Sequence, residues 1–235
     1  MDASRKTAIL VGALFLIALI LNLIATEILN PILNIPDYLV YAYPNKNAVI
    51  LANMLNLICA IAMIFIPISL FPIVRKQDQH VATGYMVFRA LEGILFIYMT
   101  IKTLSFISLS KAYLNAGTQT ASYLQTLGDS IHAELQWAVV IDVIVFTLGA
   151  GLFYCLLYKS KLVPRFLSVW GLVAALILFA GAITALFGVG IFSDMPFMKA
   201  MVYFAPPIAL NELVLGIWLL VKGFNTSESV GSYNN

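Results

Sequence analysis

Charged residues are scarce in this sequence. Only 10% of the 235 residues are Asp, Glu, Lys or Arg, and the formal net charge is +2. A soluble domain carries about 25% charged residues, and a nucleic-acid-binding domain gathers Lys and Arg on one basic face. The composition therefore excludes an ordinary soluble globule, and we expect no nucleic-acid partner. A disordered chain is excluded as well, because 62% of the residues are hydrophobic.

Cysteine and histidine are also rare, with two of each. Cys59 and Cys155 both lie in apolar runs, so we expect no disulfide framework. His80 and His132 lie at opposite ends of hydrophobic segments. These residues are too few for a structural zinc site or a bis-histidine haem. We therefore expect neither a cofactor nor a metal site.

Long hydrophobic runs dominate what remains. Six runs are close to or longer than the roughly 20 residues that a helix needs to cross about 30 Å of hydrocarbon. They are continuous rather than alternating, which excludes the strands of a membrane barrel. We predict an all-α membrane protein with one six-helix transmembrane domain over 1–224 and a polar tail over 225–235. The predicted helices cover 7–29, 48–71, 81–109, 131–158, 166–191 and 201–221.

Basic residues gather in alternate loops, which predicts the orientation of the chain. One set of loops and ends carries Arg5, Lys6, Arg75, Lys76, Lys159, Lys161, Arg165 and Lys222, whereas the opposite loops carry Lys46, Lys111 and Lys199. The positive-inside rule then places both termini in the cytoplasm. We expect the basic turn of Lys159, Lys161 and Arg165 to face anionic lipid head groups, at about 1 kcal/mol per residue. We expect a polar outer loop over 110–130 with a short helix over 122–127.

Several ionisable and amide side chains fall inside the predicted helices. An ionised group at the bilayer centre costs at least about 2.5–3.5 kcal/mol, so it faces the bundle interior and needs a partner. Arg89 and Glu92 are three residues apart and can pair on one helix face. A rise of about 1.5 Å per residue sorts the set into two layers. The central layer is Asn56, Arg89, Glu92, Asp142, Asn211 and Glu212, and the outer layer is Glu27, Asn53, His132 and Glu134.

The central layer holds one fixed positive charge and three carboxyl groups. Two uncompensated negative charges are not stable in a medium of low dielectric constant. We therefore expect a carboxyl group to be protonated, or a cation, a basic ligand or water to reach the site. Two interpretations stay open at this point. The layer is either a pocket that binds or moves a small ligand, a cation or a proton, or a structural ion pair that only fixes helix packing in an accessory membrane protein.

An intramembrane lipid-modifying enzyme is the third and weakest interpretation. The sequence has no Gly-x-Ser-x-Gly elbow, and no histidine falls at mid-depth. An acid/base pair of Glu134 and Asp142 is the enzymatic option that remains. We expect the partners to be the lipid bilayer, a small ligand or other membrane proteins, and we assign no catalytic residue.

Three stretches resemble a known family. They are GYMVFRALEG over 84–93, LLYKSKLVPRFLSVWG over 156–171 and PIALNELVLGIWLLVKGF over 207–224. Together they are similar to the bacterial membrane-protein family called domain of unknown function 4386, across nearly the whole chain. The resemblance implies a six-helix inner-membrane protein with no known activity. It supplies no catalytic residues, but it places Arg89, Glu92 and Glu212 within the matching stretches.

Overall fold

The computed structural model describes residues 3–189 and 197–225, and within these ranges all regular structure is helical. Five helices are long and apolar enough to cross a membrane, as the all-α prediction requires, and they cover Ser4–Leu33, Lys46–Val74, Gln79–Leu114, Thr118–Ser160 and Arg165–Leu186. The helices are α1 (Ala3–Leu33), α2 (Tyr38–Tyr41), α3 (Lys46–Val74), α4 (Gln79–Leu114), α5 (Thr118–Ser160), α6 (Arg165–Leu186), α7 (Phe197–Phe204) and α8 (Pro206–Val221). Helices follow from the composition, because a backbone in lipid must satisfy its own hydrogen bonds.

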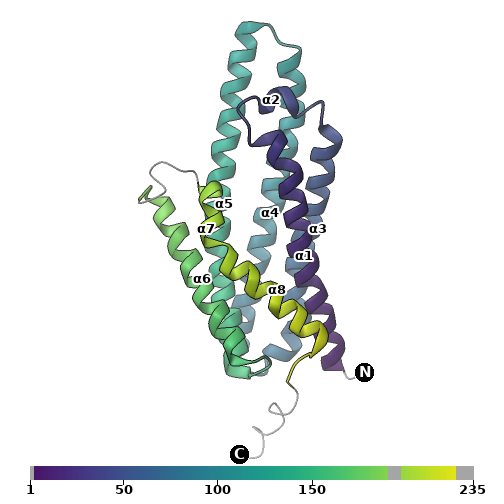
Figure 1. Cartoon of the computed structure of the whole chain (residues 1–235), viewed down its shortest axis with the longest axis vertical. Helices are drawn as coiled ribbons and strands as arrows, with labels where there is room; N and C mark the ends of the chain where they lie inside the picture. The colour runs from purple at the N-terminus through teal and green to yellow at the C-terminus, as the bar shows by residue number, and fades with distance from the viewer. Residues whose placement is uncertain (1–2, 190–196, 226–235) are drawn as a thin grey trace, which may run out of the picture.

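The long helices form an upright bundle that α8 crosses obliquely (Figure 1). α1 packs on α3 and α8, α3 on α4, α4 on α5, and α5 on α6. Close contact between α5 and α6 depends on Gly171, because a Cβ atom there would collide with the buried ring of Tyr154. The bundle therefore uses small residues to bring backbones together, as membrane helices commonly do.

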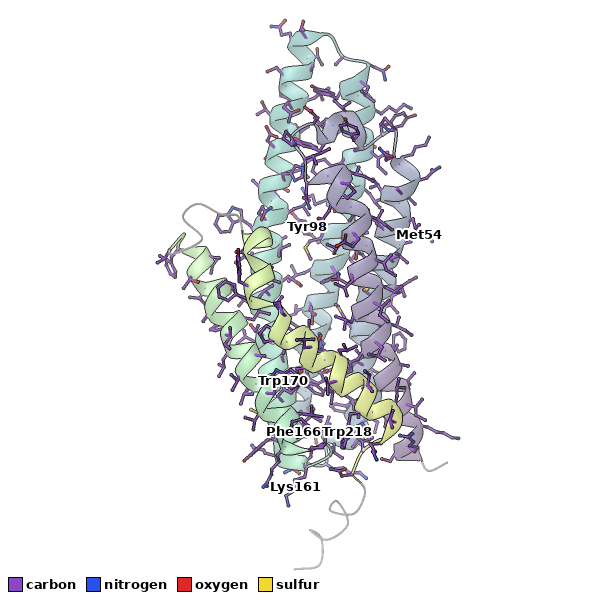
Figure 2. The ribbon with its side chains drawn as sticks, viewed as in Figure 1. Met54, Tyr98, Lys161, Phe166, Trp170 and Trp218 are labelled. Atoms are coloured by element: carbon purple, nitrogen blue, oxygen red, sulfur yellow. The ribbon has the colours of Figure 1, made fainter. Side chains whose placement is uncertain are left out.

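One end of the bundle, which we call the basic end, holds the start of α1, the α3–α4 and α5–α6 turns and the end of α8 (Figure 1). Arg5 joins two of these segments, because its guanidinium donates hydrogen bonds to the carbonyls of Leu219, Leu220 and Val221 at 3.2, 2.7 and 3.2 Å. These carbonyls belong to the last turn of α8 and lack partners within their own helix. Trp170 and Trp218 lie in the same half of the bundle as Lys161, toward the basic end (Figure 2).

The opposite end, which we call the hairpin end, corrects the predicted loop over 110–130. α4 continues to Leu114 and α5 begins at Thr118, so only residues 115–117 link them, and the short helix over 122–127 is part of α5. At about 1.5 Å per residue, the 36-residue α4 and the 43-residue α5 are roughly 54 and 64 Å long. Both exceed the hydrocarbon thickness, so their hairpin extends past it. Polar composition alone suggested a loop, but polar residues do not end a helix.

The short helix α2 packs against this hairpin. The Tyr38 hydroxyl donates to Asp129 Oδ1 at 2.8 Å, and the ring of Tyr38 occupies the space that Gly128 leaves open. Ser110 binds the same segment, since its hydroxyl donates to the Leu39 carbonyl at 2.6 Å. Burial, followed by the hydrogen bond to Asp129 and its negative charge, raises the pKa of the Tyr38 phenol well above its ordinary value. At neutral pH the phenol is therefore a hydrogen-bond donor.

The last hydrophobic segment differs from the single helix predicted over 201–221. It consists of α7 and α8, separated at Ala205, and Pro206 and Pro207 occupy the first turn of α8. A proline suits this position because its missing N–H needs no partner there. Ala205 itself keeps helical dihedral angles, so the break comes from the missing N–H groups of Pro206 and Pro207, which interrupt the backbone hydrogen bonds between α7 and α8. α6 ends at Leu186, and the end of the predicted 166–191 helix, the side chain of Lys199 and the tail beyond Asn225 lie outside the described residues.

Candidate functional site

A buried ion cluster joins α4 to α8. Arg89 Nη1 donates to both carboxylate oxygens of Glu92, at 3.0 and 2.8 Å, and the two residues are only 4% and 2% exposed. Arg89 Nη2 lies 3.5 Å from Glu212 Oε1 on α8. The structure thus contains the Arg89–Glu92 pair that the spacing predicts, and it adds Glu212 from a helix far along the chain.

Aromatic rings surround the guanidinium and close the cluster toward the basic end. The Arg89 guanidinium carbon lies 5.9 Å from the centre of the Phe15 ring and 6.0 Å from that of Tyr85, within range of cation–π attraction. Tyr85 precedes Arg89 by about one turn of α4, on the side of the basic end. Phe153 stacks on Tyr85 at 4.8 Å and on Phe15 at 5.9 Å. We call these three buried residues, Phe15, Tyr85 and Phe153, the aromatic floor.

Three cavities follow one another above this floor. The inner cavity, of about 200 Å³, borders Arg89, Glu92 and Glu212. The middle cavity, of about 320 Å³, lies between α1 on one side and α4 and α5 on the other. The outer cavity, of about 740 Å³, borders Tyr38 of α2 and Asp129 of α5 near the hairpin end. Adjacent cavities share walls, so they form a series.

Asp142 forms the wall between the inner and middle cavities. It borders both of them, and it is 7% exposed. Its Oδ1 atom is buried and has no hydrogen-bond partner among the described residues, whereas both oxygens of Glu92 are bound by Arg89. Burial of an unpaired polar atom costs free energy. Asp142 is therefore the acid in this region that the surrounding helices leave without a counter-ion.

The asparagines of the predicted layers have different surroundings. Asn56 borders the middle cavity, and its Oδ1 atom is buried without a partner among the described residues. Asn211 borders none of the three cavities, because its amide donates to the Leu167 carbonyl at 2.9 Å and so ties α8 to α6. The Asn53 amide donates to the Val49 carbonyl of its own helix at 2.8 Å. Of these three asparagines, only Asn56 borders a cavity, so depth along the helix alone did not predict which asparagine faces the site.

The predicted outer layer does not assemble. His132 borders the middle and outer cavities, with its ring between those of Tyr38 and Phe106 at 4.3 and 4.6 Å. Glu27 is exposed, and Glu134 forms an ion pair of 2.5 Å with Lys102 on α4. The two glutamates are turned away because equal depth does not fix the direction in which a side chain leaves its helix.

The two members of the proposed acid/base pair do not meet in any of the three cavities. Glu134 borders none of them, and its side chain is 43% exposed, while Asp142 lies between two of them. The two carboxyl groups therefore have no common cavity in the described part of the chain. This geometry does not support the enzymatic option.

Comparison with known proteins assigns the chain to a family. The family model described as "Domain of unknown function (DUF4386)" matches residues 10–223. The chain belongs to this family. None of the curated proteins and none of the solved structures compared with the chain matches it. The resemblance found in the three sequence stretches is confirmed, and the matched DUF4386 region contains the whole series of cavities.

The basic turn of this DUF4386 chain lies where α5 meets α6. Lys159 is in the last turn of α5, Lys161 follows it in a left-handed conformation with φ of 54°, and Arg165 begins α6. The Arg165 guanidinium lies 5.2 Å from the centre of the Tyr158 ring. Lys161 is at the basic end in Figure 2. The three residues therefore belong to one turn, apart from the three cavities, in which Lys159 and Arg165 are exposed and Lys161 is half-buried.

The DUF4386 fold also reveals site residues that the sequence analysis missed. Asn22, Thr26, Asn30 and Asn34 recur at every fourth position of α1 and just after it, and all four border the middle cavity. Residues four apart lie on one face of a helix. This polar stripe, Asn22 to Asn34, is visible in the sequence as a period of four inside an apolar segment. Charge and depth do not single the stripe out, because its four side chains are uncharged; only its periodicity does.

Proposed function

We propose that this DUF4386 protein is a multi-pass protein of a bacterial inner membrane, with six crossings and both termini in the cytoplasm. α7 and α8 together supply the sixth crossing, because α8 alone has only 16 residues. Basic residues such as Arg5, Arg75 and Lys161 occur in the segments of the basic end. By the positive-inside rule this end faces the cytoplasm.

Reporter fusions test this orientation. Alkaline phosphatase is expected to be inactive when fused after Asn235 and active when inserted at residues 115–117, because the enzyme matures only outside the cytoplasm. A fluorescent protein that folds in the cytoplasm is expected to give the reverse pattern at the same two positions. Active phosphatase at the C-terminus would show that the six-crossing orientation is wrong.

We propose further that the protein binds a small organic ammonium ion, with Asp142 as its counter-ion. The observation that carries this proposal is the buried Asp142 Oδ1 without a hydrogen-bond partner, between two cavities. The middle cavity offers Phe96, Met99 and Phe106 as an apolar and aromatic surface opposite polar groups. Aromatic faces and a carboxylate together favour an organic cation. A volume of about 320 Å³ is in the usual range for small-molecule sites.

The neighbouring charges support a cation rather than an anion. Arg89 is already paired with Glu92 and lies close to Glu212, so its positive charge is compensated. Asp142 adds a third carboxyl group to the same region. A bound ammonium ion would neutralise it without disturbing the ion cluster.

Calorimetry with 2-phenylethylammonium as the probe tests the proposal, using protein in lipid nanodiscs. We expect the ammonium ion to bind, the neutral analogue 2-phenylethanol to bind much more weakly, and Asp142→Asn to lose at least about 30-fold in affinity, since loss of a buried charge partner costs about 2 kcal/mol or more. Glu134→Gln, which changes a carboxyl group of the same helix outside the cavities, should bind as the wild type does. Absence of binding, or equal binding by Asp142→Asn, would refute the proposal.

A structural role is the second candidate function, and the ion cluster favours it. Arg89, Glu92 and Glu212 tie α4 to α8, and Asn211 ties α8 to α6. In that case the protein acts through partner helices, and Asp142 has no ligand. The two interpretations predict opposite effects on stability when Asp142 is replaced by an apolar residue.

A further inference from the structure

The three cavities follow one another from the hairpin end to Asp142, and each shares lining residues with the next. The outer and middle cavities share Thr26, Asn30 and His132 as lining residues. The middle and inner cavities share Asn22, Phe96 and Asp142. α1 runs toward the hairpin end and α5 runs away from it (Figure 1). Asn30, Thr26 and Asn22 on α1, and His132 and Asp142 on α5, therefore lie progressively deeper from the hairpin end.

The walls of this path are polar where they face the outside. Thr26, Asn30 and Asn34 are exposed residues of the polar stripe, and Asn22 is half-buried deeper in the bundle. The His132 Nε2 atom is buried without a hydrogen-bond partner among the described residues, although the ring lies against two aromatic rings. Four residues of helix rise by about 6 Å, so the stripe offers an amide or hydroxyl group at intervals of about 6 Å. These groups can replace water around a cation as it moves inward.

The path is closed on the other side. The ion cluster and Phe15 line the inner cavity, and Tyr85 and Phe153 pack behind them toward the basic end. The three rings of the aromatic floor are each 3% exposed or less. No residue of the basic end lines any of the three cavities in the described part of the chain. An ion pair backed by stacked rings leaves no polar surface for a hydrated cation to follow.

We infer that Asp142 is reached from the hairpin end only, through the outer cavity and past His132, along the polar stripe of α1. This inference rests on the proposed ammonium site and adds the side from which its ligand comes. The ligand class is a water-soluble ammonium ion from the compartment that the hairpin end faces. The ion cluster and the aromatic floor are the barrier between Asp142 and the opposite compartment.

Cysteine labelling tests the path. In a background with Cys59→Ala and Cys155→Ser, single substitutions Asn30→Cys, Thr26→Cys and Asn22→Cys would be exposed to a membrane-impermeant trimethylammonium methanethiosulfonate. The matched control is Leu23→Cys, next to Asn22 on α1 but 57% exposed on the outer surface of the bundle. The reagent would be added to sealed vesicles of each orientation, so that it meets one end of the bundle at a time.

From the hairpin end, we expect all three path cysteines to react at least ten times faster than Leu23→Cys, with the rate falling from Asn30 to Asn22. From the basic end, we expect no reaction at any of them. Equal labelling from both ends would overturn one-sided access. Labelling by the membrane-permeant N-ethylmaleimide but not by the charged reagent would instead show access from the lipid, and would overturn the inference as well.

The labelling needs no ligand, so its failure can be separated from failure of the proposed function. If the path cysteines react as expected while 2-phenylethylammonium does not bind, the path stands and the ammonium ligand is wrong. If the ammonium ion binds and requires Asp142 while labelling comes from both ends, the site stands and the one-sided path is wrong. Three positions at different depths keep the test usable when one variant fails to fold.

Discussion

Arg89→Met is expected to lower the free energy of unfolding by about 3–5 kcal/mol, because it removes one partner of a buried ion cluster. Glu92 is 2% exposed, and both of its carboxylate oxygens accept hydrogen bonds from Arg89. Without the guanidinium, its carboxylate has no counter-ion in the bundle interior, and Glu212 loses the same partner. Met keeps an unbranched side chain in the space among Phe15, Tyr85 and Phe146, so the lost charge dominates the effect.

The measurement is reversible unfolding in mixed detergent micelles, followed by circular dichroism. Lys102→Met is the matched control, because it breaks the ion pair with Glu134 on the exposed surface of the same helix, and it should change stability far less. The double variant Arg89→Met/Glu92→Met should recover part of the loss, since Glu92 is no longer left without a counter-ion while Glu212 still is. If Arg89→Met were as stable as Lys102→Met, the cluster would not hold α4 to α8.

Asp142→Leu is expected to have the opposite effect and to raise the free energy of unfolding by about 1–3 kcal/mol. The reason is that the Asp142 Oδ1 atom is buried without a partner among the described residues, and an unsatisfied buried polar atom costs about that much. The cavities on both sides of Asp142 leave room for the slightly larger side chain. The same variant should no longer bind 2-phenylethylammonium. A residue whose removal increases stability and ends binding is retained for its ligand.

Asn211→Leu provides the contrast under the same conditions. Asn211 is fully buried as well, and its Oδ1 atom also has no partner among the described residues, but its amide donates to the Leu167 carbonyl. Its replacement removes a hydrogen bond of a kind that Asp142 does not make, so it should lower stability. If Asp142→Leu lowered stability as Asn211→Leu does, Asp142 would be a packing residue. The structural interpretation of the central layer would then be the better one.

Much of the fold could be predicted from the sequence because hydrophobic length and charge are local properties. Apolar length alone predicts the five long apolar helices, and spacing alone predicts the pairing of Arg89 with Glu92. A constant rise per residue also brought Glu92 and Glu212 to similar depth, and Arg89 indeed contacts both. These results need only helix geometry and the cost of an unpaired charge in lipid.

Which side chains face the cavities depends on how each helix is rotated about its own axis. The sequence of one helix does not determine this rotation, because it depends on the helices that pack around it. Glu134 and Asp142 lie on the same helix, yet one points to Lys102 at the surface and the other into the bundle. Asn211 lies beside Glu212 in the sequence but faces α6 rather than the cavity. The polar stripe on α1 was readable from its period of four, but its meaning required the cavity that α4 and α5 complete.

The protonation of Asp142 follows from the charges that face it. Glu92, Glu212 and Arg89 border the inner cavity with Asp142, and His132 borders the middle cavity. With one guanidinium for three carboxyl groups, we propose that Asp142 holds a proton while the site is empty. Binding of a primary ammonium ion then converts the acid to a carboxylate paired with the ion and releases the proton to water.

The most direct test of the ammonium site is the number of protons released when 2-phenylethylammonium binds, measured by calorimetry in buffers of different ionisation enthalpy. We predict that the wild-type protein releases about one proton per bound ammonium ion, because ligand binding and proton binding compete for the same carboxyl group. Glu134→Gln should release the same number. Binding without proton release in the wild-type protein would contradict the exchange of a proton for a cation at Asp142.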